Sequence, residues 1–214
     1  MIDKLHYISQ ETENISHLEA IKKTLIAGAK WIQLRVKNKP EEVILELAIN
    51  ANALCKTYGA KLIVNDHALI ALKAEAYGLH LGLTDMPIAE ARSIVGEQMV
   101  IGGTANTFEH VKQRVAEGAD YIGLGPYRFT NTKQNLSPII GLEGYKAIMK
   151  QVSLSGITTP IVAIGGIELA DISLIMTTGL HGVALSGALT NSVDPATELV
   201  QMYDALKVLT PINN

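Results

Sequence analysis

Short apolar segments alternate along the whole chain with longer segments in which apolar residues recur at helical spacing. Most of the short segments are continuously apolar, as is typical of parallel strands covered on both faces, so each predicts a buried strand. The predicted strands are Leu5–Ser9, Trp31–Val36, Lys61–Val64, Gly78–Leu81, Met99–Gly102, Tyr121–Leu124, Pro160–Ile164 and Gly182–Leu185.

The segments between these strands carry apolar residues three and four positions apart, which predicts helices with one buried face. The first face comprises Leu18, Ile21, Leu25 and Ile26, and later faces include Val43, Leu45, Leu47, Ala48, Ala51, Ile88, Ala91, Ile94, Val111, Val115, Ile172, Ile175, Met176, Leu199, Met202, Tyr203 and Leu206. Gly28, Gly118 and Gly179 each follow a predicted helix, where glycine supplies the positive φ of a C-terminal cap.

This alternation of strands and helices predicts an α/β fold, a TIM (β/α)8 barrel that takes up residues 1–214 as a single domain. An open doubly wound sheet is the alternative, but it normally carries a glycine-rich phosphate loop after its first strand. Here the turn after Ser9 contains no glycine, which favours the closed barrel.

Composition narrows the classes of partner. Apolar residues make up 48% of the chain and charged residues 18%, and the formal net charge is −3 with no long basic stretch, so we expect no nucleic-acid partner. No apolar stretch approaches the roughly 20 residues that cross a bilayer, and the N-terminal residues lack a signal-peptide pattern. The single cysteine, Cys55, is expected to be buried and unreactive. We therefore expect a cytoplasmic protein without membrane partners, and the oligomeric state is left open, a homo-oligomer included.

Active sites of such barrels lie at the carboxyl ends of the strands, so the residues after each strand carry the functional signal. In the second strand, alternation places Gln33, Arg35 and Lys37 on one side of the chain. Burying these three polar groups together without a ligand is unfavourable. They predict a site for an anionic or polar ligand, with a solvated strand end as the alternative.

Two carboxylates follow the third and fourth predicted strands. Asp66 and Asp85 each stand where an aspartate often caps the next helix, so taken singly they do not establish a site. Together, on adjacent strand ends, they resemble a Mg²⁺ site, because Mg²⁺ is held by one or two carboxylates, water and ligand phosphates. His80 lies inside a strand and is expected to be hydrogen-bonded locally rather than to bind the metal.

The remaining strand ends suggest phosphate binding. Thr104 follows two glycines after the fifth strand, and Thr130, Asn131, Thr132 and Lys133 lie in the longest irregular segment, after the sixth. The pairs Gly165-Gly166 and Ser186-Gly187 follow the seventh and eighth strands, where barrels commonly bind phosphate through free backbone amides.

The order and spacing of these motifs resemble the thiamine phosphate synthase family over nearly the whole chain. The motifs are Gln33-Leu34-Arg35-Val36-Lys37, Val64-Asn65-Asp66, His80-Leu81-Gly82-Leu83-Thr84-Asp85, Gly123-Leu124-Gly125-Pro126, Thr130-Asn131-Thr132-Lys133, Ile164-Gly165-Gly166-Ile167 and Ser186-Gly187. The resemblance implies that a pyrimidine diphosphate and a (carboxy)thiazole phosphate are condensed to thiamine phosphate, with release of pyrophosphate, and of CO₂ from the carboxylated thiazole. The substrates are thus two small phosphorylated heterocycles.

The resemblance also implies a role for each matching residue. Asp66 and Asp85 would bind Mg²⁺, and Arg35, Lys37 and Lys133 would be the catalytic cations. The pyrimidine diphosphate would contact Gln33, Leu34, Arg35, Val36, Lys37, Asn65, Thr104 and Lys133. The thiazole phosphate would contact Thr130, Asn131, Thr132, Gly166, Ser186 and Gly187.

Three positions depart from the family pattern, with Leu83 in place of Gln, Asn106 in place of His and Thr104 in place of Ser. We expect the first two to affect rate more than reaction type. Two alternatives stay open. One is a thiazole tautomerase of the same fold, which resembles a barrel that has lost the diphosphate and metal residues. The other is a non-catalytic sensor of a phosphate ligand.

Overall fold

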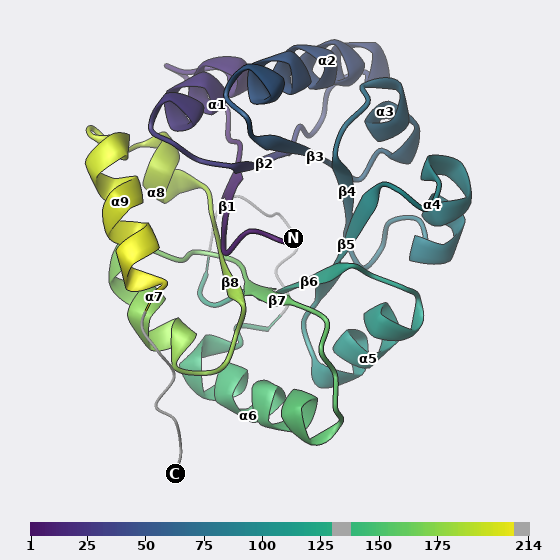
Figure 1. Ribbon diagram of the computed structural model, residues 1–214, viewed down its shortest axis with the longest axis vertical. Helices are drawn as coiled ribbons and strands as arrows, with labels where there is room; N and C mark the ends of the chain where they lie inside the picture. The colour runs from purple at the N-terminus through teal and green to yellow at the C-terminus, as the bar shows by residue number, and fades with distance from the viewer. Residues whose placement is uncertain (130–137, 208–214) are drawn as a thin grey trace.

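Parallel strands close into a barrel surrounded by helices in this computed structural model, which describes residues 1–129 and 138–207. Each strand pairs with its neighbours in sequence, and β1 pairs with β8 to complete the ring (Figure 1). The strands are β1 Leu5–Ile8, β2 Trp31–Leu34, β3 Lys61–Asn65, β4 Gly78–Leu81, β5 Val100–Ala105, β6 Tyr121–Leu124, β7 Ile161–Ala163 and β8 Gly182–Leu185. The closed ring confirms the predicted TIM barrel and excludes the open sheet.

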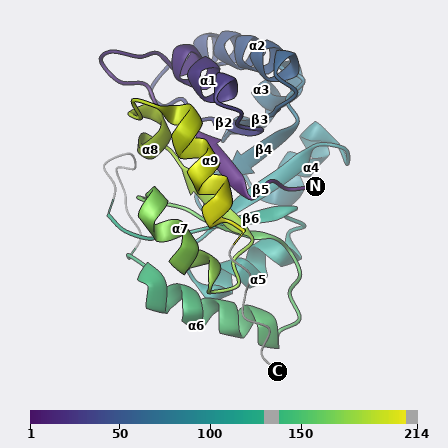
Figure 2. The same ribbon diagram turned by 60° about the vertical axis from the view of Figure 1, so that its left-hand side comes forward.

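The helices form the outer layer of the molecule. They are α1 His17–Ile26, α2 Glu41–Thr57, α3 Ala68–Lys73, α4 Ile88–Val95, α5 Phe108–Ala116, α6 Gly141–Leu154, α7 Leu169–Met176, α8 Gly187–Thr190 and α9 Pro195–Ala205. The last helix, α9, packs between α7 and α1 and so joins the two ends of the helical ring (Figure 2).

Strand alternation divides the apolar residues into two cores. The larger one lies between the strands and the helices. The smaller one fills the barrel itself with Trp31, Ile63, Tyr121, Val162 and Ala184. The N-terminal segment runs towards the centre of the ring in Figure 1, and Ile2 packs against this inner cluster. The barrel is therefore a packed solid near the amino ends of its strands.

Glycine ends the helices as predicted. Gly28, Gly118 and Gly179 have φ values of 110°, 83° and 88°, the left-handed region in which a Cβ atom is strained. Cys55 is fully buried on α2, and burial raises the pKa of its thiol to about 12, in agreement with an unreactive core residue.

Some local predictions are wrong. The second strand was expected to reach Val36 but ends at Leu34, and Val43 was expected on the buried face of α2 but is 40% exposed. The fifth strand was expected to end at Gly102 but continues to Ala105, because Thr104 and Ala105 pair with Gly123 and Leu124 of β6. Ile26 was expected on the buried face of α1 but is 63% exposed. It lies at the C-terminal end of the helix, beyond the turn that packs on the barrel.

Candidate active site

Polar side chains from the second to the fifth strand converge at the carboxyl ends of the strands. Gln33 of β2 donates from Nε2 to Asn65 Oδ1 of β3 at 2.8 Å. Both residues are buried, at 4% and 7% exposed. Arg35 and Lys37 continue on the same side of the chain beyond the end of β2, as the alternation predicted. We call this end of the barrel the rim.

Leu34 and Val36, which the resemblance places at the pyrimidine diphosphate, have their side chains elsewhere. Both are buried, at 1% and 3% exposed, and they pack in the core between the strands and the helices. Their position follows from the same alternation that turns Gln33 and Arg35 inward. Any contact between these two residues and a ligand at the rim is therefore made by their backbone.

Asp66 lies directly after β3 and forms an ion pair with Lys37. Its backbone has a φ of 67°, which is uncommon for a residue other than glycine. Its side chain is 15% exposed and that of Lys37 is 47% exposed. The turn therefore places a largely buried carboxylate beside a cation that still reaches solvent.

Asp85 follows β4 and lies against Asp66. Its Oδ2 accepts a hydrogen bond of 2.6 Å from the Gly82 backbone N–H, and its carboxyl group lies close enough to that of Asp66 for each to shift the other's pKa. The caps of α3 and α4 are His67 and Pro87, without a side-chain cap hydrogen bond. The alternative in which Asp66 and Asp85 serve as helix caps is therefore wrong.

The electrostatics of the rim agree with a strongly coupled group of charges. Burial raises the pKa of Asp66, and Asp85 raises it further, while Lys37 opposes the rise. Burial also tends to raise the pKa of Asp85, but hydrogen bonds from Asp66 and Gly82 outweigh it and the pKa is lowered. Burial lowers the pKa of Arg35, against the attraction of both carboxylates. Two adjacent carboxylates resist ionising together, so a bound cation would relieve the site.

Thr104 lies within β5, buried at 4% exposed. Its hydroxyl is 3.1 Å from His80 Nε2, and His80 Nδ1 is 3.0 Å from the Tyr121 hydroxyl. His80 is thus hydrogen-bonded within the barrel, as expected.

The glycine turns after β7 and β8 form the other half of the rim. Gly166 has a φ of 69°, and a Cβ atom there would approach Arg128 Cγ to 2.5 Å and the Phe129 carbonyl oxygen to 3.0 Å. Ser186 precedes α8, which begins at Gly187, and its Oγ donates to Gln10 Oε1 at 3.2 Å. Gly166, Ser186 and Gly187 are each partly exposed, which is compatible with phosphate binding through backbone amides.

Thr130, Asn131, Thr132 and Lys133 lie outside the described residues. Of the departures from the family pattern, Leu83 is half-buried in the turn between β4 and Asp85. Asn106 follows β5, and its Nδ2 donates to the Gly125 carbonyl oxygen. Asn106 thus ties the end of β5 to the turn after β6.

Sequence reasoning missed two residues that support the rim. Gln10 reaches Ser186 from the turn after β1. Arg128 pairs with Asp171 at 2.5 Å and with Glu168 at 3.6 Å, so it ties the turn after β6 to the start of α7. Both residues follow a strand, and the rule that found the other rim residues applied to them as well. Neither belonged to a recognisable motif, which is why they were not singled out.

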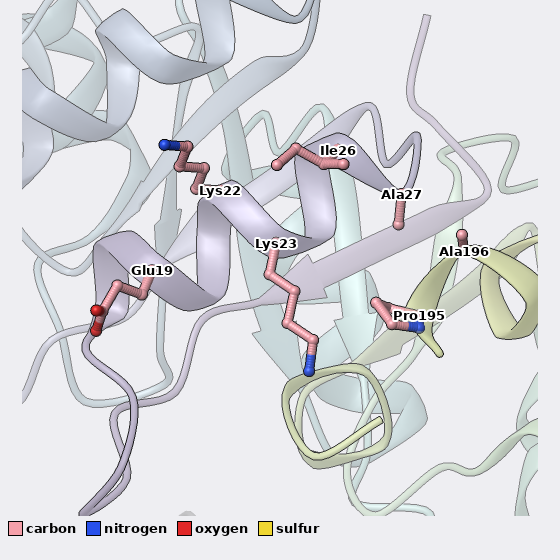
Figure 3. A pocket seen from close by; sticks show the side chains of 7 residues that line it. All are labelled: Glu19, Lys22, Lys23, Ile26, Ala27, Pro195 and Ala196. Atoms are coloured by element: carbon pink, nitrogen blue, oxygen red, sulfur yellow. The ribbon is translucent and has the colours of Figure 1, made fainter. Parts of the chain in front are cut away.

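A separate hollow of about 390 Å³ lies on the outer layer, between α1 and the start of α9. Figure 3 shows Ile26, Ala27, Pro195 and Ala196 around it, with Lys23 alongside. It belongs to the helical ring and contains none of the rim residues.

In residues 1–129 and 138–207, no three His, Cys, Asp or Glu side chains gather as a ready-made metal site. None of the helices in these ranges has the length and apolar character that crossing a membrane needs.

Known proteins resemble the chain over most of its length. A family model described as thiamine monophosphate synthase matches residues 5–189. A thiamine-phosphate synthase of Bacteroides fragilis is 53% identical over 194 residues, which cover 91% of this chain and 95% of that protein. One from Flavobacterium psychrophilum is 48% identical over 206 residues, covering 96% and 100%.

The fold agrees with these sequence relatives. The solved structure of thiamine phosphate pyrophosphorylase from Pyrococcus furiosus aligns with a TM-score of 0.81 at 29% identity, and covers 95% of both chains. The sequence relatives and this structure confirm the predicted enzyme class, a transferase of thiamine biosynthesis. The chain therefore belongs to the thiamine monophosphate synthase family.

Proposed function

We propose that this chain joins a pyrimidinylmethyl diphosphate to a thiazole phosphate at the rim, which gives thiamine phosphate and pyrophosphate. A carboxylated thiazole would also lose CO₂. The observation that carries the proposal is the convergence of Asp66 and Asp85 with Lys37 and Arg35 from three neighbouring strand ends. Such a mixed group of charges suits a diphosphate with its counter-ion.

The donor set fits Mg²⁺, a hard cation that binds through carboxylate oxygens, water and phosphate rather than a complete protein cage. Asp66 and Asp85 would hold it, and their mutual repulsion would be relieved. Bound there, the ion would offset negative charge on the leaving pyrophosphate.

The chain's own cations would serve the same purpose. As the bond from the pyrimidinylmethyl carbon to oxygen breaks, negative charge grows on the pyrophosphate and positive charge on the pyrimidine. Arg35, Lys37 and Lys133 would stabilise the leaving anion electrostatically. Gln33, Asn65 and Thr104 would hold the pyrimidine ring deeper in the barrel than the pyrophosphate. Little proton transfer is needed, and alignment of two bound rings accounts for much of the remaining rate, up to about 7–11 kcal/mol.

The thiazole phosphate would bind at the other half of the rim. Gly166, Ser186 and Gly187 would face its phosphate, and the resemblance implies that Thr130, Asn131 and Thr132 would also contact it. The positive φ of Gly166 and the absence of a Cβ atom there support this placement, because a side chain would collide with Arg128.

Mixing the purified protein with both phosphorylated rings and Mg²⁺ tests the proposal. We expect thiamine phosphate by mass, and one pyrophosphate for each product molecule. Isomerised thiazole phosphate without pyrophosphate would instead support the tautomerase. Calorimetry that shows thiazole phosphate binding, with no product and no Mg²⁺-dependent diphosphate binding, would support the sensor. Either result would overturn the proposal.

We also expect the protein to work in the cytoplasm without nucleic-acid or membrane partners, and gel filtration will show whether it forms a homo-oligomer.

A further inference from the structure

A chain of hydrogen bonds leads from the barrel interior to the rim. The Tyr121 hydroxyl lies 3.0 Å from His80 Nδ1, and His80 Nε2 lies 3.1 Å from the Thr104 hydroxyl. All three residues are nearly fully buried, at 1%, 6% and 4% exposed. Which atom donates in each of these hydrogen bonds decides whether the Thr104 hydroxyl is a hydrogen-bond donor or an acceptor towards a ligand at the rim.

Tyr121 fixes that direction. Among the described residues, its hydroxyl forms a hydrogen bond with His80 Nδ1. The Trp31 ring meets Tyr121 edge-on at 5.8 Å, and its indole N–H forms no hydrogen bond among the described residues. An indole nitrogen only donates, so His80 Nδ1 is the acceptor left for the Tyr121 proton.

The rest of the chain follows from the chemistry of imidazole. With Nδ1 accepting, the ring proton sits on Nε2 and is donated to the Thr104 oxygen. The Thr104 hydroxyl proton is then free to point at the rim. The opposite arrangement would leave the Tyr121 proton buried without an acceptor, which is unfavourable.

Glycines on neighbouring strands make room for the two rings. A Cβ atom at Gly102 would approach Tyr121 Cζ to 2.1 Å, and one at Gly123 would approach His80 Cε1 to 3.2 Å. Gly102 pairs with Tyr121, and Gly123 pairs with Thr104, in the register between β5 and β6. Glycine at these two positions therefore leaves the space that the Tyr121 and His80 rings occupy.

We propose that His80 is a positioning residue that holds the Thr104 hydroxyl as a hydrogen-bond donor towards the pyrimidine diphosphate. The inference rests on the proposed function, which places that substrate at Thr104. Tyr121 acts through His80 and sets its tautomer.

Turnover in a double-mutant cycle tests the coupling. Tyr121→Phe removes one oxygen, and we expect kcat to fall about tenfold as the donor loses its orientation. Thr104→Val should lower kcat at least as much, and Thr104→Ser should stay within about twofold of wild type. The double variant Tyr121→Phe/Thr104→Val should match Thr104→Val alone, because Tyr121 acts only through Thr104. KM for the thiazole phosphate should change less than about twofold throughout.

Tyr7→Phe is the matched control. Tyr7 is also fully buried, and its hydroxyl bonds to a threonine, Thr190, at 2.8 Å. It should lower the unfolding temperature about as much as Tyr121→Phe while kcat stays near wild type. If the losses in the double variant multiply, or if Tyr7→Phe lowers kcat equally, the inference is wrong. An inactive wild type would instead overturn the proposed function.

Nitrogen-15 NMR of the histidines tests the inference in the wild-type protein, so the result does not depend on whether a variant folds. His80→Asn identifies the signal. We expect Nε2 of His80 to carry a proton, and an unprotonated Nε2 would contradict the inference even if the variants behave as predicted.

Discussion

The two ends of the barrel interior differ in how their polar groups are satisfied. At the amino ends of the strands, which we call the floor, His6 stacks on Trp31 at 4.7 Å, and Trp31 meets Tyr121 edge-on at 5.8 Å. His6 Nε2 is 2.9 Å from the Asp3 carbonyl oxygen. At the rim, charged groups have one another as partners, and Lys37 still reaches solvent while Asp66 is largely buried.

The same strand alternation builds both ends, so the difference lies in the residues that point inward. Rings that fill space stabilise the floor, whereas the rim keeps charges close together at the expense of stability. Substitutions at the floor should therefore lower the free energy of unfolding, and substitutions at the rim should lower turnover. Tyr121 is the exception, because its hydroxyl acts on the rim through His80.

The largest effect is expected at the floor. Trp31→Ala removes a fully buried side chain and should lower the free energy of unfolding by about 3–5 kcal/mol, through lost burial and the cavity left behind. Denaturant unfolding measures the loss. Turnover per folded molecule should remain within about threefold of wild type, since Trp31 touches no substrate and its indole N–H has no part in the hydrogen bonds that lead from Tyr121 to Thr104. If Trp31→Ala kept its stability but lost turnover, the proposed difference between a floor that stabilises the fold and a rim that supports turnover would be wrong.

At the rim the pattern should reverse. Asp66→Ala or Asp85→Ala removes a proposed Mg²⁺ ligand and should lower turnover by about a hundredfold to a thousandfold, in the range of one lost electrostatic stabiliser. The unfolding temperature should fall by no more than a few degrees, because an ion pair that reaches solvent contributes little. Steady-state kinetics with saturating Mg²⁺ and a thermal melt check both parts. Turnover near wild type in both variants would show that the metal assignment is wrong.

A smaller effect is expected at the thiazole half of the rim. Gly166→Ala places a methyl group against Arg128, and we expect KM for the thiazole phosphate to rise about tenfold. Gly156→Ala is the control, because Gly156 has a φ of 65° but nothing within 4 Å of its Cβ position. Both variants carry the same backbone strain. Equal KM values in the two variants would show that Gly166 does not contribute to the thiazole phosphate site.

The smallest effect concerns pH. Burial lowers the pKa of His6 from 6.5 to about 3, so the folded floor holds this ring neutral. The unfolded chain takes up its proton below pH 6.5, so stability is lost as the pH falls from there towards 3. Between pH 7 and 5.5 the loss should be about 1 kcal/mol.

His6→Leu tests this prediction through denaturant unfolding at the two pH values. The variant should lose less stability on acidification than wild type. Burial also lowers the pKa of His17, so some pH dependence should remain. Equal dependence in both proteins would show that His6 is not held neutral by the floor.

Local sequence pattern was enough to predict the barrel strands, the glycine caps and the proximity of Asp66 to Asp85. These features follow from hydrophobic periodicity and from the rule that residues after parallel strands meet at one end of the barrel. Other features depend on neighbours distant in sequence. The length of β5 is set by pairing with β6, and the partner of Thr104 is a histidine on β4. Asp66 has a positive φ, and its residue type did not predict that backbone conformation.

Calorimetric titration of inorganic pyrophosphate into the protein, with and without Mg²⁺, tests most directly whether the rim is one diphosphate site. We predict binding that requires Mg²⁺ in the wild type and is lost in Asp66→Ala. Equal binding with and without Mg²⁺, or undiminished binding to the variant, would contradict the account.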